Sequence, residues 1–140
     1  MKVNFSEFIS ILIHNTDLIF TNYVKATLYP FNLAPEQNLI MMLLWEQDGL
    51  NQNEIADKLK KDKTNVARMI SNLEQKGFIH RVTGEDRRSL RVYLTDQGKE
   101  LGDDVIPLIH QFNDLVCKGI TDEEIEQMRR ILLKMSANVQ

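Results

Sequence analysis

Two short amphipathic segments joined by a charged turn, within residues 51–76, constrain the fold of this chain more than any other feature. Asn51 and Glu54 stand in a capping-box arrangement, in which each side chain satisfies a free backbone N–H at the start of a helix. Asp62 is a favourable N-cap for the second segment. Gly77 ends that segment, because glycine readily adopts the positive φ common after a helix. The pattern predicts two helices with a tight turn between them.

Apolar residues recur on one side of both predicted helices. They are Ile55, Ala56 and Leu59 in the first helix and Val66, Met69, Ile70 and Leu73 in the second. The opposite face of the second helix carries hydrogen-bonding side chains: Lys63, Thr64, Asn65, Arg68 and Asn72. A helix pair whose second member offers such donors has what a helix-turn-helix needs to enter the major groove of DNA.

Two β-prone, roughly alternating runs follow Gly77, over residues 78–82 and 90–94. Such runs predict strands, and the sequence GEDRRS at residues 84–89 forms the predicted hairpin tip. Thr95 is then a favourable cap for a further helix. The predicted order is a helix pair, a hairpin and another helix.

The segment from Asn51 to Gly98 resembles the winged-helix segment of the MarR family of bacterial transcriptional regulators. The resemblance rests on NQxEIAxxL at residues 51–59, LExKGFIxR at 73–81, DRR at 86–88 and LTxxG at 94–98. The last two elements in this order are the specific part, whereas a helix-turn-helix alone is a weaker signal. The flanking helices also fit. The resemblance implies a mainly α fold with a small β-hairpin wing, in which a winged helix-turn-helix is embedded in an α-helical dimerisation region.

Apolar residues at helical spacing predict a long first helix from Val3 to about Leu28. A second helix begins at Pro35 and ends near Gly49. Its centre, residues 39–45, is apolar on every side, which favours burial all round.

Two more helices are predicted after the hairpin. The first begins after Thr95 and contains Pro107, which is expected to kink or loosen it. The second begins after a capping box formed by Thr121 and Glu124.

The first, fifth and last helices carry more apolar surface than a small domain can cover, which predicts a two-fold homodimer. The resemblance implies the same assembly. We expect residues 1–33 and 96–140 to form the helical dimerisation region. Residues 34–95 are expected to form the DNA-binding domain, within one compact unit of chain.

The formal net charge of −3 conceals an uneven distribution. Residues 50–99 hold eleven Lys and Arg against seven Asp and Glu, a balance of +4, and the rest of the chain carries −7. A net positive charge is thus confined to the segment expected to meet phosphate. A local positive field of this kind attracts DNA.

A two-fold dimer is expected to place its recognition helices in successive major grooves, about 10 bp apart, on a pseudo-palindromic site of double-stranded DNA. Thr64 and Asn65 are placed to reach base edges or phosphate, and Arg68 is placed to read guanine with two hydrogen bonds. Lys60, Lys61 and Lys63 are expected to hold phosphates, although a solvated surface is the alternative.

The resemblance implies a second DNA contact at the wing. There Asp86 orients Arg88, beside Arg87, and a wing arginine enters the minor groove. A narrow A·T-rich minor groove attracts guanidinium groups. The alternative is that Asp86 and Arg88 only hold the hairpin together.

Members of this family are usually repressors, often released from DNA by a small aromatic or phenolic ligand bound where the dimerisation helices meet the winged helix. Carried onto this chain by the resemblance, that pocket involves His14, Asp17, Thr21, Met42, Trp45 and Phe112. Trp45 and Met42 would form an apolar wall, and His14 or Asp17 would anchor a polar group. Trp45 and Met42 as ordinary core residues remain the alternative.

Some relatives bind zinc, and His14, Asp17, His110 and Asp114 are conceivable ligands. No two histidines share a helix at ligand spacing, so neither a metal site nor a cofactor is predicted. A metal-responsive regulator and a winged-helix protein-interaction module stay as alternative functions. The lone Cys117 is expected to be a small buried apolar residue.

Three further classes are disfavoured by the sequence. No nucleophile pattern accompanies the histidines and no glycine-rich phosphate loop occurs, so an enzyme is not expected. Glu7, His14 and Asp17 interrupt the N-terminal apolar stretch, which argues against a signal peptide. The longest apolar run, residues 39–45, is far shorter than a membrane span. A cytoplasmic protein is therefore expected.

Overall fold

The computed structural model describes residues 1–84 and 90–140, so the predicted wing residues Asp86, Arg87 and Arg88 lie outside the described part. The chain divides into two compact units, Met1–Ile106 and Pro107–Gln140. The predicted fold class, mainly helical with a small wing sheet, is confirmed.

The first unit contains most of the secondary structure. Its helices are η1 (Phe5–Glu7), α1 (Ile9–Leu28), η2 (Tyr29–Phe31), α2 (Pro35–Glu46), α3 (Gln52–Leu59), α4 (Lys63–Gln75) and the first half of α5 (Asp96–Val116). Its strands are β1 (Leu50–Asn51), β2 (Ile79–Thr83) and β3 (Leu90–Leu94).

The prediction that one helix runs from Val3 was wrong. A 3₁₀ turn, η1, comes first, and Phe8 then adopts an extended backbone with φ −79° and ψ 124°. The continuous helix α1 therefore begins at Ile9. Apolar spacing continues across the break, so periodicity alone could not locate it.

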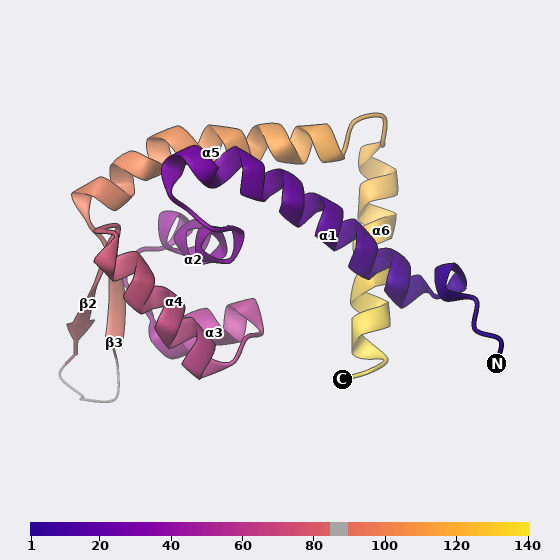
Figure 1. The fold of residues 1–140 in the computed structure, drawn as a ribbon, viewed down its shortest axis with the longest axis horizontal. Coiled ribbons are helices and arrows are strands. Elements are labelled where there is room, and N and C mark those ends of the chain that lie inside the picture. The colour runs from indigo at the N-terminus through magenta and orange to yellow at the C-terminus, as the bar shows by residue number, and fades with distance from the viewer. Residues whose placement is uncertain (85–89) are drawn as a thin grey trace. The chain divides into compact units, whose positions relative to one another are not determined.

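Helix α2 contacts α1, α3, α4 and β3, and Figure 1 shows it between α1 and the α3–α4 pair. Ile40, Met41 and Leu44 are buried on the contacting side. The prediction of burial all round was wrong, because Leu39 and Met42 are 40% and 38% exposed. These two residues lie three positions apart, on a side of the helix that its contacts leave uncovered.

The wing sheet has three antiparallel strands in the order β1-β3-β2. The hairpin β2–β3 pairs Ile79 with Leu94 and Thr83 with Leu90, close to the predicted bounds. Strand β1, which pairs Leu50 with Val92, was not predicted. Two residues are too few to show the alternation that identifies a strand.

Packing against Gly98 joins the sheet, α2 and α5. Gly98 N–H donates to Thr95 Oγ1 over 3.0 Å, which confirms Thr95 as the cap of α5. Trp45 Nε1 donates to the Gly98 carbonyl over 3.0 Å, and its indole lies against Gly102. This contact gives Trp45 a structural role in anchoring α2 to α5.

The second unit contains the second half of α5 and helix α6 (Asp122–Ala137). The predicted capping box is confirmed: Thr121 Oγ1 accepts from Glu124 N–H over 3.1 Å, and Glu124 Oε1 accepts from Thr121 N–H over 3.0 Å. Pro107 lies inside α5, where the division between the units falls. Cys117 is half-buried rather than buried.

Candidate nucleic-acid interface

Helix α4 has one buried side and one polar side, as predicted for a recognition helix. Val66, Ile70 and Leu73 are fully buried, so packing holds this side of α4 against the domain core. Asp62 Oδ1 accepts from Thr64 N–H over 3.2 Å and caps the N-terminus. Gly77 follows the helix with φ +85°, which confirms its predicted role.

The polar side of α4 presents its hydrogen-bonding groups to the surroundings. Lys63 and Thr64 are exposed in the first turn. Arg68 is exposed one turn later, and its Nη2 lies 3.4 Å from Asn65 Oδ1. This long contact biases the guanidinium toward the N-terminal half of the helix and leaves its other donors available to a base edge.

The two lysines of the α3–α4 turn differ in their surroundings. Lys60 is exposed and has a left-handed backbone, with φ 52°. Lys61 Nζ lies 3.0 Å from Glu36 Oε1, at the start of α2. A phosphate contact by Lys61 would compete with this ion pair, whereas within residues 1–84 and 90–140 the Lys60 ammonium makes no side-chain hydrogen bond and its backbone N–H is bonded to Asp57.

An ion pair joins α4 to strand β2. Glu74 Oε2 accepts from the backbone N–H of Arg81 over 2.8 Å, and Glu74 Oε1 lies 3.1 Å from Arg81 Nη2. The backbone hydrogen bond from Arg81 lowers the pKa of Glu74, with further contributions from its guanidinium and from His80. The sequence did not predict this pair, because a separation of seven residues across a turn does not show that two side chains meet.

The lowered pKa predicts that Glu74 stabilises the fold only while it is ionised. This contribution to stability is present at pH values above the ordinary carboxyl pKa of 4.5. It is lost as the pH falls through the lower pKa that Glu74 has in the folded protein. We expect Glu74→Gln to lower the free energy of unfolding at pH 7 by about 0.5–1 kcal/mol, since the pair is partly solvated. Urea denaturation of variant and wild type between pH 7 and pH 3 measures the difference, which should shrink toward acid.

Glu126→Gln is the matched control for this measurement, because the Glu126–Arg129 ion pair is far more exposed. It should leave stability unchanged within error. A difference between Glu74→Gln and wild type that stays constant down to pH 3 would contradict the assigned role.

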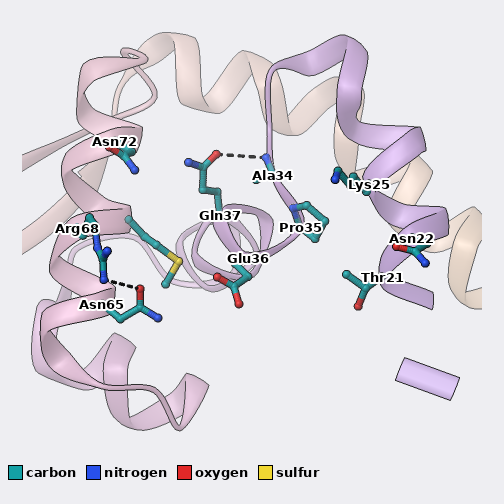
Figure 2. Close-up of a pocket in the computed structure, with 11 residues that line it drawn as sticks. Thr21, Asn22, Lys25, Ala34, Pro35, Glu36, Gln37, Asn65, Arg68 and Asn72 are labelled. Carbon is teal, nitrogen blue, oxygen red and sulfur yellow. Dashed lines mark hydrogen bonds between the residues drawn. The ribbon is translucent and has the colours of Figure 1, made fainter. Parts of the chain in front are cut away.

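A groove of about 580 Å³ lies beside the polar side of α4 (Figure 2). Asn65, Arg68 and Asn72 form its α4 wall, and Figure 2 shows the start of α2 between this wall and α1. The α1 wall consists of Thr21, Asn22 and Lys25. Met69 and Pro35 add apolar surface and Glu36 adds a carboxylate, so the groove combines charged groups of both signs with amide and apolar groups.

Only one of the six residues predicted for an effector pocket lines this groove, namely Thr21. His14 and Asp17 are exposed on α1, and Trp45 is engaged with α5. Met42 Sδ lies 3.5 Å from Asn38 Nδ2. Phe112 belongs to the second unit. The groove residues Asn22 and Lys25 were not predicted, because only the fold brings α1 and α4 to opposite walls of one groove.

Two further findings concern metals and membranes. Within residues 1–84 and 90–140, no three His, Cys, Asp or Glu side chains are grouped so that they could hold a metal ion. In the same residues, no helix combines the length and the apolarity needed to cross a bilayer.

Comparisons with known proteins agree with this geometry. A family model described as MarR family matches residues 33–90. The sequence is 28% identical over 114 residues to the HTH-type transcriptional regulator YybA of Bacillus subtilis (strain 168), covering 78% of this chain and 73% of YybA.

Two solved structures extend the likeness to nearly the whole chain. A MarR transcriptional regulator from Methanosarcina mazei Go1 is 30% identical, with a TM-score of 0.84 and coverage of 96% of this chain and 99% of that one. The MepR–DNA complex of S. aureus gives a TM-score of 0.88 at 27% identity, covering 94% of this chain and 98% of MepR.

Proposed function

This chain belongs to the MarR family of DNA-binding transcriptional regulators, and from that premise we propose that it binds a pseudo-palindromic DNA site as a homodimer and represses transcription. Proteins of this family are not enzymes, in agreement with the prediction from the sequence. The proposed regions are residues 1–33 and 96–140 for dimerisation and residues 34–95 for DNA binding.

The observation that carries the proposal is the two-sided character of α4. Its inner side is fully buried at Val66, Ile70 and Leu73, while Lys63, Thr64 and Arg68 are exposed. A rigidly packed helix with exposed donors is suited to reading base edges in a major groove. A protein-interaction module, the alternative, would be expected to show an acidic or apolar face there.

Exposed apolar side chains in both units support the homodimer. On α1, Leu12 and Ile19 are 60% and 68% exposed. On α6, Met128 and Leu133 are 53% and 71% exposed. Apolar surface of this extent is favourably covered by a second copy, and two-fold symmetry is the commonest solution.

We further propose that Lys60, Lys61 and Lys63 contact phosphates, and that Arg87 and Arg88 form the wing contact, with Asp86 orienting Arg88. Strand β2, which precedes these residues in the sequence, is tied to α4 by Glu74 and Arg81. An arginine in the segment between β2 and β3 would suit a narrow minor groove, where the negative potential is strongest.

Arg88→Ala is expected to weaken binding to all DNA sequences alike, by roughly tenfold, because one charge-assisted contact is lost. The slope of log affinity against log salt should fall by about one. Fluorescence anisotropy with specific and scrambled duplexes at several salt concentrations measures both effects. Unchanged affinity in a variant that remains dimeric would remove the wing from the DNA interface.

The proposal includes release by a small aromatic or phenolic effector, with the groove of Figure 2 as its site. Its volume of about 580 Å³ falls within the range of small-molecule sites. Because Arg68 forms part of the wall, an occupant would meet the same guanidinium that is proposed to read DNA. Titrating aromatic acids into the protein–DNA complex tests this, and release should be competitive with DNA.

The experiment that tests the proposed function is selection of bound duplexes from random DNA, combined with analytical ultracentrifugation. We expect two inverted half-sites about 10 bp apart and a dimer in solution. A reporter gene placed behind the selected site should be expressed less when the protein is present. A monomer, or no sequence preference at low salt, would refute the proposal.

A further inference from the structure

We propose that Lys76 is a positioning residue, which fixes the recognition helix on the junction between α1 and α2 and so sets the spacing of the DNA half-sites that the protein accepts. The inference rests on the proposed homodimer, because spacing has meaning only for two linked recognition helices. It assigns a role in DNA recognition to a side chain outside the polar face of α4.

The geometry of Lys76 places one ammonium group on two acceptors from the same junction. Lys76 is the C-terminal cap of α4. Its Nζ donates to the backbone carbonyl of Asn32 and to Oε1 of Gln37, each over 2.8 Å. Gln37 Oε1 also accepts from the backbone N–H of Ala34 over 3.2 Å, a bond drawn in Figure 2.

These acceptors are parts of a rigid connection. Asn32 ends η2 in a left-handed conformation, with φ 55° and ψ 40°. Leu28 and Leu33, on either side of η2, are buried, as is Gln37 in the first turn of α2. A group bound to this junction is therefore held in a fixed orientation relative to α1. Lys76 binds the junction from the end of α4.

The chemistry of the contact favours a fixed geometry. Both acceptors are neutral oxygens, and burial lowers the pKa of the Lys76 ammonium. A partly desolvated cation forms stronger hydrogen bonds than an exposed lysine does. Apolar packing through α2 also joins α1 and α4, but apolar contacts lack the direction that two hydrogen bonds impose.

A dimer converts this local constraint into a constraint on DNA. Each α4 is positioned on its own α1, and α1 is part of the proposed dimerisation region. Recognition helices of a dimer must lie about 34–36 Å apart to enter successive major grooves. A looser Lys76 contact would let each α4 tilt, so that sites with altered spacing are bound with less penalty.

The test compares Lys76→Met with wild type on a duplex selected by the wild type, and on versions with one base pair inserted or removed at its centre. Methionine retains the apolar stem but removes the donors. Lys99→Met is the matched control, because Lys99 is exposed on α5 and the change in charge is the same. Anisotropy gives the affinities, and circular dichroism and ultracentrifugation confirm a folded dimer.

We expect wild type and Lys99→Met to bind the altered duplexes at least about tenfold more weakly than the selected duplex. A loss of about tenfold in affinity is what the loss of one contact with DNA would cause. For Lys76→Met this ratio should fall to about threefold or less, chiefly through weaker binding of the selected duplex. Gln37→Met, which removes one of the two acceptors, should give an intermediate ratio. It replaces Lys76→Met as the test variant if Lys76→Met does not fold.

The outcomes separate this inference from the proposed function. If wild type shows no spacing preference or is a monomer, the proposed function fails and the inference fails with it. If wild type discriminates and a folded Lys76→Met discriminates equally, the proposed function stands and the role of Lys76 is wrong. An unchanged ratio in Gln37→Met, where that variant is needed, has the same meaning.

Discussion

Gly98→Ala is expected to destabilise the fold by about 3 kcal/mol or more, a large part of the stability of a typical domain. A Cβ atom at this position would lie 2.0 Å from the backbone carbonyl oxygen of Phe78. That carbonyl is fixed, because it accepts from Thr95 N–H over 3.1 Å. Neither backbone can withdraw without breaking the cap of α5. Thermal and urea denaturation followed by circular dichroism measure the loss.

Two other glycines serve as controls for this prediction. At Gly119, with φ +79°, an added Cβ meets no atom within 4 Å, so alanine should cost only about 1 kcal/mol for the left-handed backbone. At Gly102 the Cβ would meet Trp45 Nε1 at 2.8 Å, a side chain that can shift at some cost. The expected order of destabilisation is Gly98, then Gly102, then Gly119. A Gly98→Ala protein as stable as the Gly119→Ala protein would contradict the assigned packing.

Arg68→Ala is expected to lower discrimination at one base pair of the selected site by about 1–3 kcal/mol, or roughly 5- to 150-fold. The guanidinium is exposed on α4 and is the longest donor group on the polar side of that helix. Affinities for duplexes with each base substituted in turn, measured for variant and wild type, identify the base pair. The variant should bind the best site and its substituted form with similar affinity.

Lys99→Ala is a control with the same loss of charge, at an exposed position on α5. It should keep the wild-type pattern of base preferences. If Arg68→Ala weakens binding to every duplex by the same factor, Arg68 contacts the DNA backbone rather than a base. The assignment of base reading to Arg68 would then be withdrawn.

The helix-turn-helix and its N-caps, Asn51 and Asp62, were predictable because their signals are local, although Asn51 accepts from Asn53 N–H without the capping box predicted with Glu54. The Asp62 cap, the buried side of α4 and the positive φ of Gly77 each depend on residues within a few positions of one another. The same holds for the capping box of α6, formed by Thr121 and Glu124. Periodicity and capping chemistry are properties of single elements, so one sequence suffices to locate them.

Contacts between distant segments could not be predicted in this way. Strand β1 depends on pairing with β3, about 40 residues away by the register of Leu50 with Val92. The bond from Lys76 to Asn32 likewise joins residues 44 positions apart. The break at Phe8 lies inside an uninterrupted apolar period, so it left no signal. The DNA-contacting residues themselves remain predictions, because they depend on a partner.

The indole of Trp45 gives this protein a built-in optical reporter. It is the single tryptophan of the chain, and its Nε1–H donates to the Gly98 carbonyl in the first turn of α5. Tryptophan emission shifts in wavelength when the indole gains or loses water. Intrinsic fluorescence therefore monitors the α2–α5 contact without any label, during melting, DNA titration and ligand screening alike.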